Sequence, residues 1–157
     1  MAQRLTPYKS GVNYWLLAVD PDEYSFQDLR RDTRTVWRYV KDYASLNHLR
    51  DVESDEQTLI FHTGTELAII GVARFISDPY PDPQGTGADE QVVDVVPERL
   101  LERPVRFAEF EDLPELQDWD FIDNPDLSCV PVPPEVWERL LQMVDAPLVH
   151  STQESQA

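Results

Sequence analysis

The sequence has few of the residues that stabilise small proteins through covalent or metal cross-links. It contains one cysteine, Cys129, among 157 residues. A single cysteine excludes an internal disulfide and leaves no cysteine pair for a zinc site. Cys129 lies in an apolar Leu-Ser-Cys-Val stretch, which favours a buried thiol over a nucleophile. The longest apolar runs, such as residues 67–73, are far shorter than the ~20 residues of a membrane span.

Lysine is also scarce, whereas acidic residues are abundant. Two Lys and 11 Arg stand against 30 Asp and Glu, which gives a formal net charge of -17. Adaptation to molar salt, where charge repulsion is screened within ~3 Å, explains such a composition. Functional acidity, as in a protein that mimics nucleic acid, explains it as well. A hydrophobic content of 41% with four Trp excludes a disordered acidic tail.

The few basic side chains are concentrated in one stretch. Residues 30–50 hold six basic and two acidic residues, whereas residues 109–126 hold eight acidic residues and no Lys or Arg. A solvated helix face beside an acidic loop accounts for this pattern. A basic patch that binds an anion accounts for it equally well, and we expect any bound anion to lie there.

Motifs for catalysis or metal binding are weak. The three histidines, His48, His62 and His150, lack the i, i+4 spacing of a helical metal site. Gly85-Thr86-Gly87 lacks the further glycines and the lysine of a phosphate-binding loop. With 30 acidic residues, nearby carboxylate pairs occur by chance. We therefore expect no catalytic residues, no metal and no cofactor. Residues 1–10 lack an apolar signal core, so we expect a cytoplasmic protein.

Apolar patterning predicts an α+β domain with a small curved or closed sheet. Gly64 predicts a hairpin turn, Pro131 places the last strand at an edge, and Ser25 with Asp28 forms a helix capping box. We expect a domain over residues 12–145 between flexible tails at 1–11 and 146–157, with a loop at 78–89. The expected strands cover residues 13–19, 58–63, 66–77, 91–96 and 127–132, and the expected helices cover 25–31, part of 37–50, 107–110, 114–116 and 135–144.

An ordered series of short motifs resembles the EVE domain family, a branch of the PUA-like superfamily related to YTH domains. The series comprises Asn13-Tyr14-Trp15-Leu16, Asp20-Pro21, Val36-Trp37, Tyr43, Asn47, Leu49-Arg50, Phe61-His62-Thr63-Gly64, Tyr80-Pro81-Asp82 and Leu127-Ser128. The resemblance implies a PUA-like small β-barrel with helices in the connections. It also implies a non-catalytic module that recognises a modified base, such as a methylated cytosine or adenine, in DNA or RNA.

The resemblance further implies an aromatic-lined pocket for that base. Trp37 would stack on the base, an interaction worth ~1–3 kcal/mol. Asp42 stands where the family has Asn, and a carboxylate favours a base that presents donors. The expected pocket residues are Trp37, Tyr39, Asp42, Tyr43, Asn47, His62, Thr63 and Ser128, and the expected phosphate contacts are Arg34, Arg38, Lys41 and Arg50.

Two other functions stay open at this point. The first is an acidic PUA-like module that has lost nucleic-acid binding and contacts a protein through residues 109–126. The second, with less support, is a hydrolase of modified nucleotides. The expected partners are DNA or RNA with a modified base, and the small size is compatible with action beside a partner enzyme. No membrane partner is expected.

Overall fold

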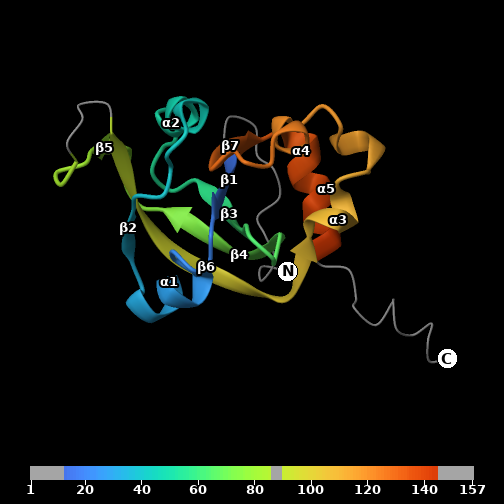
Figure 1. The fold of residues 1–157 in the computed structure, drawn as a ribbon, viewed down its shortest axis with the longest axis horizontal. Helices are drawn as coiled ribbons and strands as arrows, with labels where there is room; N and C mark the ends of the chain where they lie inside the picture. Colours follow the sequence, from blue (N-terminus) through green and yellow to red (C-terminus); the bar gives the residue numbers. More distant parts are fainter. Residues whose placement is uncertain (1–12, 86–89, 145–157) are drawn as a thin grey trace.

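A curled, mixed β-sheet forms the centre of the computed structural model, which describes residues 13–85 and 90–144 (Figure 1). The strands follow the order β2-β6-β4-β3-β1-β7, and the short β5 pairs with β6. All neighbouring strands are antiparallel except β1 and β3, which are parallel. The strands are β1 (Tyr14–Val19), β2 (Thr35–Trp37), β3 (Gln57–His62), β4 (Ala68–Phe75), β5 (Tyr80–Pro81), β6 (Gln91–Arg106) and β7 (Cys129–Val132).

Helices occupy the connections between these strands. In Figure 1, α3, α4 and α5 gather at one end of the sheet, whereas α1 and α2 lie toward the other. The helices are α1 (Phe26–Asp32), α2 (Tyr43–Leu49), α3 (Phe107–Phe110), α4 (Asp120–Asp123) and α5 (Pro134–Val144), with a 3-10 turn, η1, at Pro114–Leu116. The predicted α+β class is thus confirmed, and the sheet is a curled half-barrel with β2 and β7 as its outer strands.

The curvature of the sheet comes largely from β6, which is 16 residues long and pairs with β2, β4 and β5. The register between β4 and β6 shifts twice, between Ile69 and Gly71 and again between Val72 and Ala73. Such irregularities bend a strand and increase its twist. The sequence analysis predicted only residues 91–96 of this strand, because the later residues mix charged side chains with apolar ones.

Hydrophobic cores lie on both faces of the central strands. Along β1, Tyr14, Leu16 and Ala18 belong to a core with α3, α4 and α5. The alternate residues Trp15, Leu17 and Val19 belong to a second core with α1 and α2. Side chains alternate between the two faces of a strand, so a strand covered on both faces is apolar throughout. This explains why every residue of β1 is apolar and buried.

Several local predictions are confirmed. Ser25 caps α1, where its hydroxyl accepts from the Asp28 N–H at 3.0 Å. Gly64 adopts a φ of 76° in the turn between β3 and β4, and β7, which contains Pro131, lies at the sheet edge. Within residues 37–50, helix α2 begins only at Tyr43, and β2 before it was not predicted. The loop at 78–89 contains the short strand β5. The expected tails at 1–11 and 146–157 lie outside the described residues.

Candidate functional site

The carboxyl ends of the parallel strands β1 and β3 meet at one edge of the sheet, which brings distant residues together. Val19 pairs with His62, and the Thr63 N–H donates to the Val19 carbonyl at 2.9 Å. The Ala18 N–H donates to the Ser128 carbonyl at 3.0 Å. Three of the expected pocket residues, His62, Thr63 and Ser128, are therefore placed along this edge by backbone pairing.

Asp42 connects α2 to the residue that precedes β7. One carboxylate oxygen accepts from the Ser128 hydroxyl at 2.6 Å and from its N–H at 3.2 Å. The other oxygen accepts from the Ser45 N–H at 3.0 Å and caps α2. Burial alone would raise the pKa of Asp42, but the hydrogen bonds from Ser128 and Ser45 outweigh it and hold the pKa below its usual value. The primary role of this carboxylate is thus structural, which differs from the expected contact with a base edge.

Tyr24, Trp37 and Tyr39 form an aromatic cluster beside the turn that follows β1. Tyr24 and Tyr39 stack with ring centroids 5.3 Å apart, and Trp37 meets both rings edge-on at 6.0 and 5.1 Å. Burial raises the pKa of Tyr24 to about 12 and also raises that of Tyr39, so both phenols are neutral at ordinary pH. The cluster is therefore uncharged, with Trp37 and Tyr24 buried and Tyr39 partly exposed.

Trp37 itself is 1% exposed, so its ring lies in the core. This differs from the expectation that the ring is available to a base. The indole Nε1 of Trp37 is buried and has no hydrogen-bond partner among the described residues. Because a buried N–H without an acceptor costs about 1 to 3 kcal/mol, such groups are rare and require an explanation.

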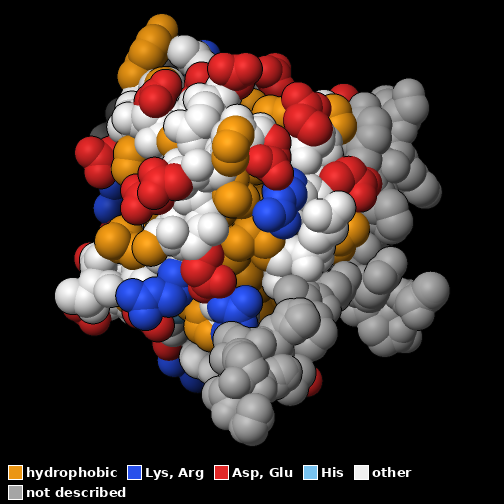
Figure 2. All heavy atoms as spheres, turned by 90° about the vertical axis from the view of Figure 1, so that its right-hand side faces the viewer, with side chains coloured by type: hydrophobic (Ala, Val, Ile, Leu, Met, Phe, Trp, Pro, Cys, Tyr) orange, Lys and Arg blue, Asp and Glu red, His pale blue; other side chains and the backbone are white. Residues whose placement is uncertain are grey.

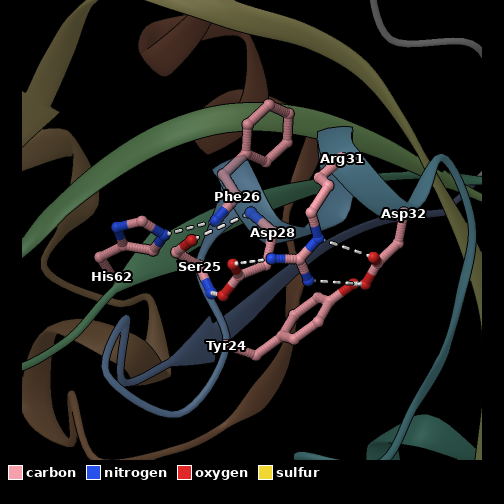
Figure 3. Close-up of polar contacts among 7 residues, drawn as sticks. All are labelled: Tyr24, Ser25, Phe26, Asp28, Arg31, Asp32 and His62. Atoms are coloured by element: carbon pink, nitrogen blue, oxygen red, sulfur yellow. Dashed lines mark hydrogen bonds and ion pairs between the residues drawn. The ribbon is translucent and has the colours of Figure 1, made fainter.

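His62 is also buried, at 4% exposure, and both of its ring nitrogens have partners, of which Figure 3 shows the Phe26 N–H. Its Nε2 accepts from the Phe26 N–H at 3.0 Å, which assigns the proton to Nδ1. Nδ1 then donates to Glu66 at 2.5 Å. Figure 3 also shows Tyr24, whose hydroxyl donates to Asp32 at 2.8 Å on the same stretch of chain that leads into α1. His62 thus fastens the start of α1 to the end of β3, close to the aromatic cluster.

Two expected pocket residues, Tyr43 and Asn47, lie on the exposed face of α2. Tyr43 is 78% exposed at the first position of the helix. Asn47 is exposed and accepts from the Arg50 guanidinium at 3.0 Å. Their motif positions did not reveal that α2 turns these side chains toward solvent.

Expected phosphate contacts form ion pairs with carboxylates among the described residues. The pairs are Arg34 with Asp94 at 3.1 Å, Arg38 with Asp82 at 3.1 Å and Lys41 with Glu23 at 2.6 Å. The Arg38 guanidinium contacts both carboxylate oxygens, and the side chain of Asp82 is only 11% exposed. Phosphate must compete with these carboxylates, so the positive stretch in the sequence is largely neutralised in the fold.

A cavity of about 370 Å³ lies beside the aromatic cluster, between α2 and the β5–β6 hairpin. Val40, Leu46 and Val92 give it an apolar floor, and Arg38, Lys41 and Gln91 provide polar groups. Arg38 stands between Trp37 and Tyr39 in the chain. Among the described residues no aromatic side chain lines this cavity, so the cavity and the aromatic cluster are adjacent but separate.

Charge is unevenly distributed on the face of the molecule that carries α3, α4 and α5. Acidic side chains dominate the upper half of the view in Figure 2, and Lys and Arg side chains lie in its middle and lower part beside hydrophobic ones. Within residues 13–85 and 90–144, no three His, Cys, Asp or Glu side chains gather as a metal site would require. No helix in the same part of the chain is long and apolar enough to cross a membrane. Cys129 is buried, and burial raises the pKa of its thiol.

The family model described as the EVE domain matches residues 13–143, which is nearly the whole described region. The chain belongs to the EVE domain family. It is 26% identical over 86 residues to thymocyte nuclear protein 1 of Rattus norvegicus, a match that covers 47% of this chain and 38% of the rat protein. The chain thus matches less than half the length of this curated relative.

Two solved structures share the fold of this EVE domain. The first is human THYN1 protein in complex with DNA containing 5-methylcytosine, with a TM-score of 0.78, 20% identity and coverage of 87% of this chain and 99% of that chain. The second is the YTH domain of Zygosaccharomyces rouxii MRB1 protein in complex with N6-methyladenosine RNA. It has a TM-score of 0.55, 11% identity and coverage of 90% and 92%, respectively. The expected relation to YTH domains is confirmed at the level of the fold.

Proposed function

We propose that this EVE domain binds nucleic acid that carries a modified base, and that it does so without catalysing a reaction. The observation that carries the proposal is the buried Trp37 N–H, which has no acceptor among the described residues and lies within the aromatic cluster. A ligand with an acceptor on a planar ring would satisfy this donor. The complex of human THYN1 with 5-methylcytosine DNA supports a modified base as that ligand.

Tyr39 occupies the place that the base would take. Its ring stacks on Tyr24 with an interplanar angle of 17°, and a nucleobase can stack on Tyr24 in the same way. Binding would displace Tyr39 and bring an acceptor on the base to the Trp37 N–H. The adjacent cavity beside Arg38 supplies space for such a rearrangement.

The conformation in which Tyr39 stacks on Tyr24 would lower the apparent affinity for the base, because only molecules with Tyr39 displaced are competent to bind. Replacing Tyr39 by Ala removes the competing ring and leaves Tyr24 and Trp37 in place. We expect Tyr39→Ala to bind the modified base at least as tightly as the wild type. If Tyr39 is instead a wall of the pocket, the same variant loses affinity.

An acidic protein-interaction module is the second candidate. The specific observation in its favour is the pairing of Arg34, Arg38 and Lys41 with carboxylates of the chain itself. The segment 109–126, which includes α3, η1 and α4, would then supply the contact with a partner. In that case Trp37 has only a structural role.

Fluorescence anisotropy distinguishes the two functions. Short labelled DNA and RNA strands, single and duplex, would carry unmodified bases, 5-methylcytosine, 5-hydroxymethylcytosine or N6-methyladenine. Titrations at about 0.15 M and at molar KCl compare binding under weaker and stronger screening of electrostatic interactions. A saturable preference for one modification supports recognition of a modified base if the affinity falls about two- to tenfold in Trp37→Phe and is unchanged in Trp119→Phe. Equal, weak binding of all strands by a folded protein refutes it.

A further inference from the structure

We propose that a second pocket, at the turn between β3 and β4, binds a phosphate group of the nucleic-acid backbone. This inference rests on the proposed function and adds a contact outside the aromatic cluster. The pocket has a volume of about 430 Å³. Its lining consists of Thr65, Glu66 and Ala68 on one side and of Arg103, Pro104 and Arg106 on the other, and we call it the Arg106 pocket.

The two arginines of this pocket have donors to spare, unlike the cations predicted from the sequence. Arg106 is exposed, and its guanidinium has no partner among the described residues. Arg103 contacts Glu109 through Nη1 alone, at 2.9 Å to each carboxylate oxygen. The N–H of Nε and an N–H of Nη2 are therefore not used in that contact. These two N–H groups form a planar fork that matches two oxygens of a phosphate.

The acidic groups near the Arg106 pocket are already engaged. Glu109 accepts from Arg103 and from the backbone N–H of Arg106. Among the described residues, Glu66 is the one carboxylate in the lining, and it accepts from His62 Nδ1 at 2.5 Å. A phosphate would accordingly lie on the side of the pocket that carries Arg103 and Arg106, away from Glu66. The negative charge of Glu66 opposes the binding of phosphate, but Glu66 does not accept from the guanidinium N–H groups of Arg103 and Arg106.

The rim of the pocket is held in an unusual backbone conformation. Leu67 adopts a φ of 43°, in the left-handed region that side chains other than glycine rarely take. Its carbonyl accepts from the Phe107 N–H at 2.8 Å, which fixes the turn against the start of α3. Backbone strain that the surrounding structure maintains is concentrated at binding sites.

A short chain of contacts connects the Arg106 pocket to the aromatic cluster. Glu66 accepts from His62 Nδ1. His62 Nε2 in turn accepts from the N–H of Phe26 (Figure 3). Tyr24, a member of the cluster, lies two residues before Phe26. Both sites thus border the edge of the sheet where β3 ends. A single strand with its modified base at Tyr24 would place a flanking phosphate toward Arg106.

The test compares the salt dependence of binding for Arg106→Gln and Arg30→Gln. Arg30 is the matched control, since it is an exposed arginine whose guanidinium contacts only Gln27 among the described residues. Each phosphate contact contributes a slope of about 0.7 to 0.9 to the fall of log K with log salt. We expect Arg106→Gln to reduce the slope by about one contact, equally for modified and unmodified strands, while Arg30→Gln leaves it unchanged. Equal slopes for the two variants overturn the inference.

A second measurement does not depend on recognition of a modified base. Inorganic phosphate is titrated into the full chain while the arginine side-chain N–H signals are followed by NMR. The signals of Arg103 and Arg106 should shift together and saturate, and Glu66→Gln should tighten the binding severalfold because it removes the opposing charge. Absence of these shifts overturns the inference. If the wild-type protein shows these NMR shifts with phosphate but no preference for modified strands in the anisotropy titrations, only the proposed function is refuted.

Discussion

Replacing Trp37 by Phe separates the stability of this protein from its binding. Trp37 and Trp119 are 1% and 2% exposed, so the same change at either position removes a comparable amount of buried ring. The two indoles differ in one respect. Trp119 Nε1 donates to the Pro131 carbonyl at 2.9 Å, whereas Trp37 Nε1 has no acceptor among the described residues.

The free energies of unfolding should differ accordingly. Loss of the smaller ring of the indole leaves a cavity that costs about 1 to 2 kcal/mol at either site. At Trp37, removal of an unsatisfied buried N–H returns about 1 to 3 kcal/mol, so the net change is close to zero. At Trp119, loss of a hydrogen bond adds about 0.5 to 1.5 kcal/mol to the cost. Trp119→Phe should therefore be less stable than Trp37→Phe by about 2 to 4 kcal/mol.

Urea denaturation followed by circular dichroism measures this difference, and anisotropy with the preferred modified strand measures binding. We expect Trp37→Phe to lose about two- to tenfold in affinity, the equivalent of one hydrogen bond, while Trp119→Phe binds as the wild type does. If Trp37→Phe is destabilised as strongly as Trp119→Phe, its N–H is satisfied in the free protein. That result would remove the basis of the proposed site.

Two further changes test the fold around the site. A Cβ on Gly71 would lie 2.6 Å from the Phe26 ring and 2.8 Å from a backbone oxygen, so Gly71→Ala should cost about 1 to 3 kcal/mol; an unchanged urea midpoint would contradict this close approach. The lowered pKa of Asp42 stabilises the fold above the usual carboxyl pKa of 3.8, and this contribution is lost as the pH falls through the folded value. Asp42→Asn keeps the helix cap, so stability measured against pH should lose part of its acid-dependent fall, and an identical acid limb would refute the role of Asp42.

Local sequence signals predicted the elements that are determined by neighbouring residues. The capping box of Ser25 and Asp28 fixed the start of α1 because both of its hydrogen bonds lie within three residues. The turn at Gly64 followed from the need for a positive φ. By contrast, β2 is three residues long and is stabilised by pairing with β6, so its own residues carry little signal.

The site was predicted less well, because its properties depend on residues far apart in the chain. Motif positions identified Trp37 and Asp42, but their roles depend on which side chains surround them. The hydroxyl of Ser128, 86 residues away in the chain, donates a hydrogen bond to the Asp42 carboxylate. The Arg106 pocket carries no sequence signal, since Arg106 is one charged residue in a long strand of mixed composition.

The sequence by itself determined the family, the α+β class, the apolar strands and the uneven charge, because each follows from composition or from motifs in order along the chain. Only the tertiary structure decided which arginine side chains remain available to bind a ligand. Arg34 and Arg38 meet Asp94 and Asp82 across 60 and 44 residues. The guanidinium of Arg106, by contrast, contacts no carboxylate among the described residues, and only the backbone N–H of Arg106 donates to Glu109. Coulomb interactions depend on distance in space, and the spacing of residues along the chain does not set that distance before the sheet curls.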